Sequence, residues 1–256
     1  MPTSLSLDQH LTTLADSGTR LAAHVAATPK GRKVPTCPAW DATALMAHQA
    51  MVHRWATAQV RGEDPSGLPT QTALRRRRTL PRYYGEGLDG IVSALREAPS
   101  DLQAMTFLND APAPREFWAR RQAHETTMHM VDALAGSLDR VPSTAEAAVD
   151  RSVAIDGIDE LLRGFFTRGR SKLFEGAEYA FVVAPDDDDC HWVVDVAERL
   201  TVRDGDRASV DGAVATLNGS AAALYLALWN RGSDVRVEGD GAIVDRWRST
   251  QQVRWS

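Results

Sequence analysis

The sequence contains few cysteines, no long apolar run and no excess of basic residues, and each absence excludes a class of protein. Only Cys37 and Cys190 occur in 256 residues, so at most one disulfide can form. No secretory leader is recognisable at the start of the sequence, so we expect both thiols to be reduced. Nowhere do about 18 apolar residues follow one another without a charge, as a membrane span would require. We therefore predict a cytoplasmic protein.

The charge balance does not indicate binding to nucleic acid or to a membrane surface. The chain carries 34 acidic and 29 basic residues, and its formal net charge is -5. A nucleic-acid-binding domain would instead show a basic excess. The run Arg75 to Arg78 is the one exception, and it indicates either a solvated loop or a site for an acidic partner. We expect small-molecule partners, no nucleic acid and no membrane, and a monomer or homodimer.

Hydrophobic periodicity predicts helices in the first two thirds of the chain. The first two cover about residues 7–29 and 41–61, the third follows residue 81, has apolar positions 88, 91, 92 and 95 and ends at Pro99, and the last two cover 115–138 and 143–166. Asp41 is a good cap for the second, and Ser143 with Glu146 forms a capping box at the start of the fifth. Residues 62–81 contain glycine, proline and arginine without a clear period, which predicts a loop with some helix at its end.

After about residue 176 the pattern changes to short valine-rich runs, which are typical of strands. The predicted strands are 179–184, 191–196, 200–203 and 235–238. A helix over 220–230, after the cap-like Asn218, and a terminal helix complete this part. We therefore predict two domains, a helical one over residues 1–175 and an α+β one over 176–256.

The helix predicted over 115–138 carries an unusual polar stripe. Glu125 and His129 are four residues apart, so they lie within about 40° of one another on one helical face. His124 diverges from His129 by about 140°, so the pair is not the HExxH motif of zinc proteases. The full stripe is Trp118, Arg121, Glu125, His129 and Asp132. It either faces solvent or is buried with partners, such as a metal ion for Glu125 and His129 and a hydrogen bond from His129 to Asp132.

The second predicted helix contains a further candidate metal ligand, His48. His48 shares a stripe with three apolar residues and should point inward, whereas His53 diverges from it by about 140°. The apolar residues are Leu45, Val52 and Trp55. A lone inward histidine is usually a satisfied core residue, but His48 with Glu125 and His129 makes a set that suits zinc or another divalent first-row metal. Three protein ligands leave coordination positions for water or substrate, as in a catalytic site.

Several motifs resemble the mycothiol-dependent maleylpyruvate isomerase family, within the wider DinB-like metal-binding superfamily. They are Cys37-Pro38-Ala39-Trp40-Asp41, Leu45-Met46-Ala47-His48 and His124-Glu125-Thr126-Thr127-Met128-His129, with Asp156-Gly157-Ile158-Asp159-Glu160, Leu217-Asn218-Gly219-Ser220, Leu228-Trp229-Asn230-Arg231 and Gly239-Asp240 further along. The resemblance covers nearly the whole chain. It implies a DinB-like four-helix bundle followed by a small α+β domain similar to sterol carrier proteins.

The resemblance also implies a chemistry. It makes His48, Glu125 and His129 the ligands of a divalent metal, most often zinc, the same set that helical geometry selects. The metal would activate mycothiol, the low-molecular-weight thiol of actinobacteria, as a thiolate. As cosubstrate, the thiolate would add to the double bond of maleylpyruvate, allow rotation and then be eliminated, or be transferred to another small electrophile. The family implicates an arginine of the C-terminal domain, for which Arg231 is the first candidate and Arg236 the second. A helix C-terminus also attracts arginine, which gives Arg231 a second interpretation.

Two non-catalytic functions stay open at this point. The chain could be a small-ligand-binding or stress-related protein whose metal only stabilises the helices, or a regulatory protein without metal. A structural zinc site normally has four protein ligands, and the sequence offers three, which favours catalysis. The electrophile, the native metal and the choice between isomerisation and transfer are not encoded in any motif.

Overall fold

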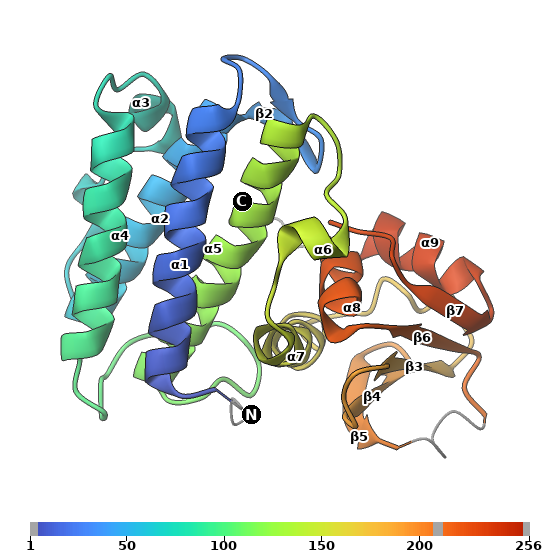
Figure 1. Ribbon diagram of the computed structural model, residues 1–256. Coiled ribbons are helices and arrows are strands. Elements are labelled where there is room, and N and C mark those ends of the chain that lie inside the picture. Colours follow the sequence, from blue (N-terminus) through green and yellow to red (C-terminus); the bar gives the residue numbers. More distant parts are fainter. Residues whose placement is uncertain (1–4, 207–211, 253–256) are drawn as a thin grey trace. The chain divides into compact units, whose positions relative to one another are not determined.

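Four long helices pack together in the N-terminal part of the chain (Figure 1). They are α1 (Leu7–Ala27), α2 (Ala42–Arg61), α4 (Leu80–Glu97) and α5 (Pro114–Leu138). The computed structural model describes residues 5–206 and 212–252. Helix α1 packs mainly on α5, and α2 packs on both α4 and α5. The predicted helical bundle is therefore confirmed.

Local sequence signals explain where these helices begin. The side chain of Asp41 accepts a hydrogen bond from the backbone N–H of Ala44 at 2.8 Å, which caps α2 as predicted. Helix α4 begins at Leu80, at the end of the segment 62–81 for which the sequence predicts a loop with some helix at its end. Leu80 and Tyr84 are buried and extend the apolar stripe of Leu88 toward the N-terminus at a spacing of four. Pro81 lies in the first turn of α4. The backbone N–H groups of a first turn have no partner within the helix, so the missing N–H of proline costs no hydrogen bond there.

A short hairpin precedes α2, and the sequence did not predict it. Strand β1 (Lys33–Val34) pairs antiparallel with β2 (Cys37–Asp41), and Pro35 and Thr36 form the turn between them. Two short strands among prolines have no measurable period, so the pattern predicts only a break between helices here. The predicted loop over 62–81 contains the 3-10 turn η1 (Pro65–Gly67) and the short helix α3 (Gln71–Arg75).

The C-terminal part of the chain contains a five-stranded mixed sheet with the order β5-β4-β3-β6-β7. Its elements are β3 (Tyr179–Pro185), β4 (His191–Val196), β5 (Leu200–Gly205), β6 (Ala215–Gly219), α8 (Ala221–Leu228), β7 (Arg236–Gly239) and α9 (Ala242–Thr250). β3 pairs antiparallel with β4 and parallel with β6. The predicted α+β character is confirmed, but β6 was missed and the cap of α8 is Ser220, not Asn218.

The predicted continuous helix over 143–166 is wrong. The capping box of Ser143 and Glu146 is present, but α6 (Thr144–Ala147) ends after one turn. Ala148 has φ 48°, in the left-handed region, so the helix cannot continue through it. Helix α7 (Arg151–Asp159) follows and continues into a π-helical segment, η2 (Glu160–Phe165).

Contacts divide the chain into two units near residue 142, whereas the sequence led us to expect the boundary at 175. One unit holds the described residues up to 107 together with 111–142, and the other holds 108–110 and those from 143 onward. Helix α7 and segment η2 belong with the sheet because Trp192 Nε1 donates to Asp159 Oδ1 at 3.0 Å and Arg163 Nη1 donates to the Val202 carbonyl at 3.0 Å.

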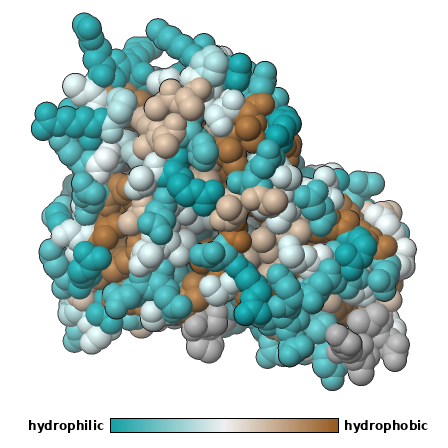
Figure 2. All heavy atoms as spheres, viewed as in Figure 1, coloured by the Kyte–Doolittle hydropathy of each residue, from teal (hydrophilic) through white to brown (hydrophobic). Residues whose placement is uncertain are grey.

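The surface is mainly hydrophilic on the face drawn in Figure 2, where apolar residues lie in small separate groups. Among the described residues, few large apolar side chains are exposed: Met105, Leu138, Val141 and Val214. No helix in the described ranges has the length and apolar character needed to cross a membrane.

Candidate metal centre

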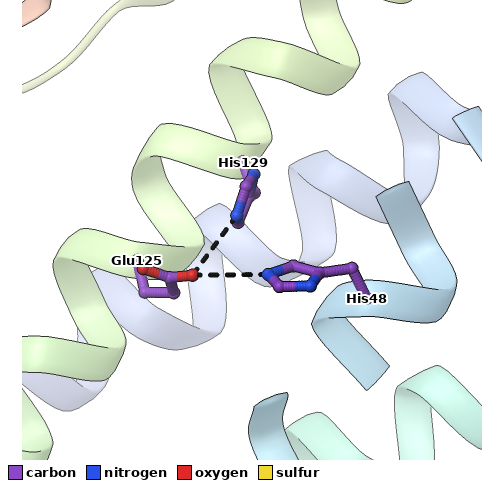
Figure 3. A group of neighbouring side chains, drawn as sticks. All are labelled: His48, Glu125 and His129. Atoms are coloured by element: carbon purple, nitrogen blue, oxygen red, sulfur yellow. Dashed lines mark ion pairs between the residues drawn. The ribbon is translucent and has the colours of Figure 1, made fainter. Parts of the chain in front are cut away.

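Three side chains converge in the bundle, His48 from α2 and Glu125 and His129 from α5 (Figure 3). One nitrogen or oxygen from each lies within 4.8 Å of the others. Glu125 Oε1 lies 3.6 Å from His48 Nε2 and 3.3 Å from His129 Nε2. All three residues are buried. The structure therefore brings together the set that the sequence selected.

The separations and the unsatisfied atoms fit a metal ion. Among the described residues, His48 Nε2 and Glu125 Oε1 are buried without a hydrogen bond, and buried polar atoms without partners are costly. Tetrahedral zinc with ligands at about 2.0–2.1 Å holds neighbouring ligand atoms about 3.3 Å apart, close to the separations found here. Two imidazoles and a carboxylate also form a donor set typical of zinc and other divalent first-row metals.

A further set of polar residues orients these candidate ligands. His129 Nδ1 lies 2.9 Å from Oδ2 of the fully buried Asp132. An ionised carboxylate only accepts hydrogen bonds, so in a neutral imidazole Nδ1 carries the proton and Nε2 presents its lone pair to the cluster. Arg121 Nη2 donates to Glu125 Oε2 at 3.2 Å, so Oε1 is the oxygen that faces the histidines.

Electrostatics favour a cation in this cluster. Burial opposes ionisation of Glu125, yet His129, His48 and Arg121 hold the pKa of its carboxyl well below the usual range. Burial also opposes protonation of His129, but Asp132 and Glu125 outweigh it and raise its pKa to about 9. Burial lowers the pKa of His48, with Glu125 acting in the opposite direction. A divalent ion would supply positive charge that the two buried carboxylates, Glu125 and Asp132, attract.

Trp40 of β2 packs on the imidazoles. Its ring centroid lies 4.7 Å from that of His48, with 38° between the ring planes, and 6.0 Å from that of His129. The two imidazole centroids are 5.0 Å apart in an edge-to-face arrangement. The half-buried indole therefore limits the movement of both histidines.

The structure also settles which other polar residues of these helices lie outside the cluster. His53 is fully buried and lies within hydrogen-bond distance of Gln49 and Thr126, at 2.9 and 3.0 Å. His124 packs edge-on against His10 at 6.1 Å. Both are absent from the cluster, as helical geometry predicted. The alternative that the stripe of α5 faces solvent is wrong, because all five of its members are buried.

The candidate arginines lie in the sheet-containing unit. Arg231 follows α8, and its Nη1 donates to the Trp229 carbonyl at 2.7 Å. Arg236 donates to both carboxylate oxygens of Asp186, at 3.0 and 3.1 Å. Cys37 and Cys190, which both lie in the described ranges, form no disulfide, as predicted.

Sequence reasoning missed part of the centre. The helical spacing places Arg121 in the stripe without identifying it as a partner of Glu125, although an arginine four residues before a glutamate is a usable signal. For Trp40 the sequence offers only its place in the motif Cys37-Pro38-Ala39-Trp40-Asp41. Thr36 donates to Asp132 Oδ1 at 2.6 Å, and no local pattern marks it.

The fold and the cluster define a two-unit protein with a two-histidine, one-carboxylate set inside a helical bundle. Residues 11–134 match the mycothiol maleylpyruvate isomerase N-terminal domain, and residues 152–246 match the MDMPI C-terminal domain. The chain therefore belongs to the mycothiol-dependent maleylpyruvate isomerase family, a family of enzymes.

Solved structures agree on the fold. One match is the crystal structure of a mycothiol-dependent maleylpyruvate isomerase, whose sequence is 14% identical to this chain. Its TM-score is 0.61, and the match covers 93% of this chain and 96% of that one. A histidine-to-alanine mutant of that enzyme has the same identity and coverage, with a TM-score of 0.63. Comparison with curated proteins gave no match.

Proposed function

We propose that this protein is a metal-dependent enzyme that activates mycothiol as a thiolate and adds it to a small electrophile. The reaction is either an isomerisation of the maleylpyruvate type or a transfer of the thiol. One observation carries the proposal: within residues 5–206 and 212–252, only three side chains form the cluster. A four-coordinate ion held by three protein ligands keeps one position for an external ligand, as in catalytic sites.

The residues of the proposed centre have two kinds of role, holding the metal ion and orienting the ligands. His48, Glu125 and His129 would hold a divalent ion, with zinc the first candidate. When bound, such an ion stabilises a thiolate at neutral pH, which turns a mostly protonated thiol into a nucleophile. Asp132 holds the proton on Nδ1 of His129, and Arg121 fixes the orientation of the Glu125 carboxylate. These contacts hold the candidate ligand atoms of His129 and Glu125 in place.

An anionic substrate such as maleylpyruvate needs a cationic partner. Arg231 is the first candidate for this role and Arg236, which donates to both carboxylate oxygens of Asp186, is the second. The hydrogen bond of Arg231 to the Trp229 carbonyl also fits the second interpretation, a cation that stabilises a helix C-terminus. Separate substitution of the two arginines distinguishes these roles.

The test is elemental analysis of the purified, untagged protein, followed by titration with mycothiol while proton release is measured. We expect about one divalent ion per chain and one proton released per thiol bound, followed by turnover in a screen of electrophiles that begins with maleylpyruvate. Bound metal without thiol-linked proton release would favour the alternative, a small-ligand-binding or stress-related protein with a structural metal. Absence of metal after reconstitution would overturn the proposal.

A further inference from the structure

The β1–β2 hairpin contacts both helices that carry the candidate ligands. We infer that Thr36, in the turn of this hairpin, is a positioning residue for His129 and acts on it through Asp132. The inference rests on the proposed metal centre and extends it to a residue outside the bundle helices.

A chain of two hydrogen bonds connects Thr36 to the cluster. The Thr36 hydroxyl donates to Asp132 Oδ1 at 2.6 Å, and Asp132 Oδ2 lies 2.9 Å from His129 Nδ1. The two oxygens of one carboxylate therefore hold different partners. Because the carboxylate is planar, fixing Oδ1 also fixes the direction in which Oδ2 meets the imidazole. The hydroxyl thus restricts the rotation of the carboxylate and, through it, the ring of His129.

Other contacts fix the hairpin against α5, so that Thr36 has a defined position. Val34 is fully buried. It packs so closely on Gly136 that a Cβ atom added to this glycine would lie 3.4 Å from Cγ2 of Val34. Gly136 is four residues beyond Asp132 and lies on the same face of α5. Immediately before the hairpin, Arg32 Nη1 donates to the Ser137 carbonyl at 3.3 Å. The hairpin therefore contacts the last turns of α5 at several points.

The same hairpin reaches α2 at its other end. Trp40 packs on His48, and Asp41 caps the first turn of α2. Arg75 Nη2 lies 2.5 Å from the second carboxylate oxygen of Asp41. Since the hairpin is fixed to α2 near His48 and to α5 near His129, it connects the two ligand-bearing helices independently of a metal.

Loss of the hydroxyl should weaken metal binding without unfolding the bundle. Hydrogen-bond partners of metal-ligating residues contribute about 10- to 100-fold to metal affinity. Thr36 is one bond further from the metal, so we expect the lower end of this range, about 10-fold. Valine has the same shape as threonine without the donor, and serine retains the donor.

The experiment compares Thr36→Val and Thr36→Ser with a matched control, Thr57→Val. Thr57 is also half-buried, but its hydroxyl donates to the backbone carbonyl of His53 at 2.8 Å. Zinc affinity is measured by competition with a chromogenic chelator, and the visible spectrum of the cobalt-loaded protein reports ligand geometry. Thermal unfolding of each metal-free variant reports stability.

We expect Thr36→Val to bind zinc about 10-fold more weakly and to change the cobalt spectrum, while Thr36→Ser and Thr57→Val resemble the wild type. Unchanged affinity of Thr36→Val, or equal losses in Thr36→Val and Thr36→Ser, would overturn the inference while the metal centre stands. Absence of metal binding in the wild-type protein would instead overturn the proposed function and, with it, this inference.

Discussion

Nδ1 of His129 lies 2.9 Å from Oδ2 of Asp132, one helical turn further along α5. In a neutral imidazole, a carboxylate at this distance keeps the proton on Nδ1. The other nitrogen, Nε2, then faces Glu125 and His48 as a potential metal ligand. A buried acidic residue that does not itself join the cluster therefore orients one of its three side chains.

Asp132→Asn should reduce zinc affinity about 10- to 100-fold, because an amide loses the negative charge that favours the Nδ1–H tautomer. The measurement is chelator competition on the purified variant. Asp139→Asn is the matched control, since Asp139 is exposed at the end of α5 and its closest ionic contact is Arg32 at 3.9 Å. Equal affinities of the Asp132→Asn variant and the wild type would show that the hydrogen bond does not orient the ligand.

Alanine substitution of each candidate ligand, His48, Glu125 or His129, should lower the bound metal far below one ion per chain. Each change removes one of three donors, a larger loss than the 10- to 100-fold expected for an outer partner. Elemental analysis after gel filtration provides the measurement. His24→Ala on α1 is a partly buried histidine control, and His53→Ala and His124→Ala should also retain metal. Loss of metal in His124→Ala alone would contradict the assignment of helical faces.

The stability of the metal-free protein should depend on pH partly through His53. Burial lowers the pKa of His53 to about 3 in the folded state, against about 6.5 in an unfolded chain. Between these two pKa values the unfolded state binds one more proton than the folded state, so the free energy of unfolding rises with pH. This contribution of His53 to stability is lost as the pH falls below about 6.5.

His53→Gln should flatten this dependence by up to about 1.4 kcal/mol per pH unit. Urea unfolding of metal-free protein at several pH values between about 4.5 and 7 measures the slope. The slope is the relevant quantity, because a packing defect caused by glutamine changes the free energy of unfolding by the same amount at every pH. The same slope in wild-type and variant proteins would mean that His53 is already protonated in the folded state.

Arg231→Gln should reduce kcat/KM about 100-fold if this guanidinium stabilises a developing negative charge. The assay uses mycothiol and the electrophile on which the wild-type protein acts, and metal content is measured in parallel. Arg236→Gln should have a much smaller effect, because Arg236 forms an exposed pair with Asp186. Equal activities of the two variants would favour the role of Arg231 at the helix C-terminus.

Regular elements were predicted well where the sequence has a strong period, as in α2 and α5. Prediction failed where a single backbone angle or a pairing partner decides the structure. Ala148 ends α6 through its left-handed conformation, although alanine normally favours a helix. Strand β6 is short and contains Asn218, and it exists because β3 and β7 pair with it on either side.

The sequence alone determined which residues of one helix share a face, and so grouped Glu125 with His129 and separated both from His124. This grouping follows from the angular period of the α-helix, which is local. Tertiary structure decided how close His48 comes to that pair, and it brought Thr36 to Asp132 across 96 positions of the chain. These separations depend on how α2 and the hairpin pack against α5. Packing between distant segments arises from the sum of many side-chain contacts, which no short stretch of sequence encodes.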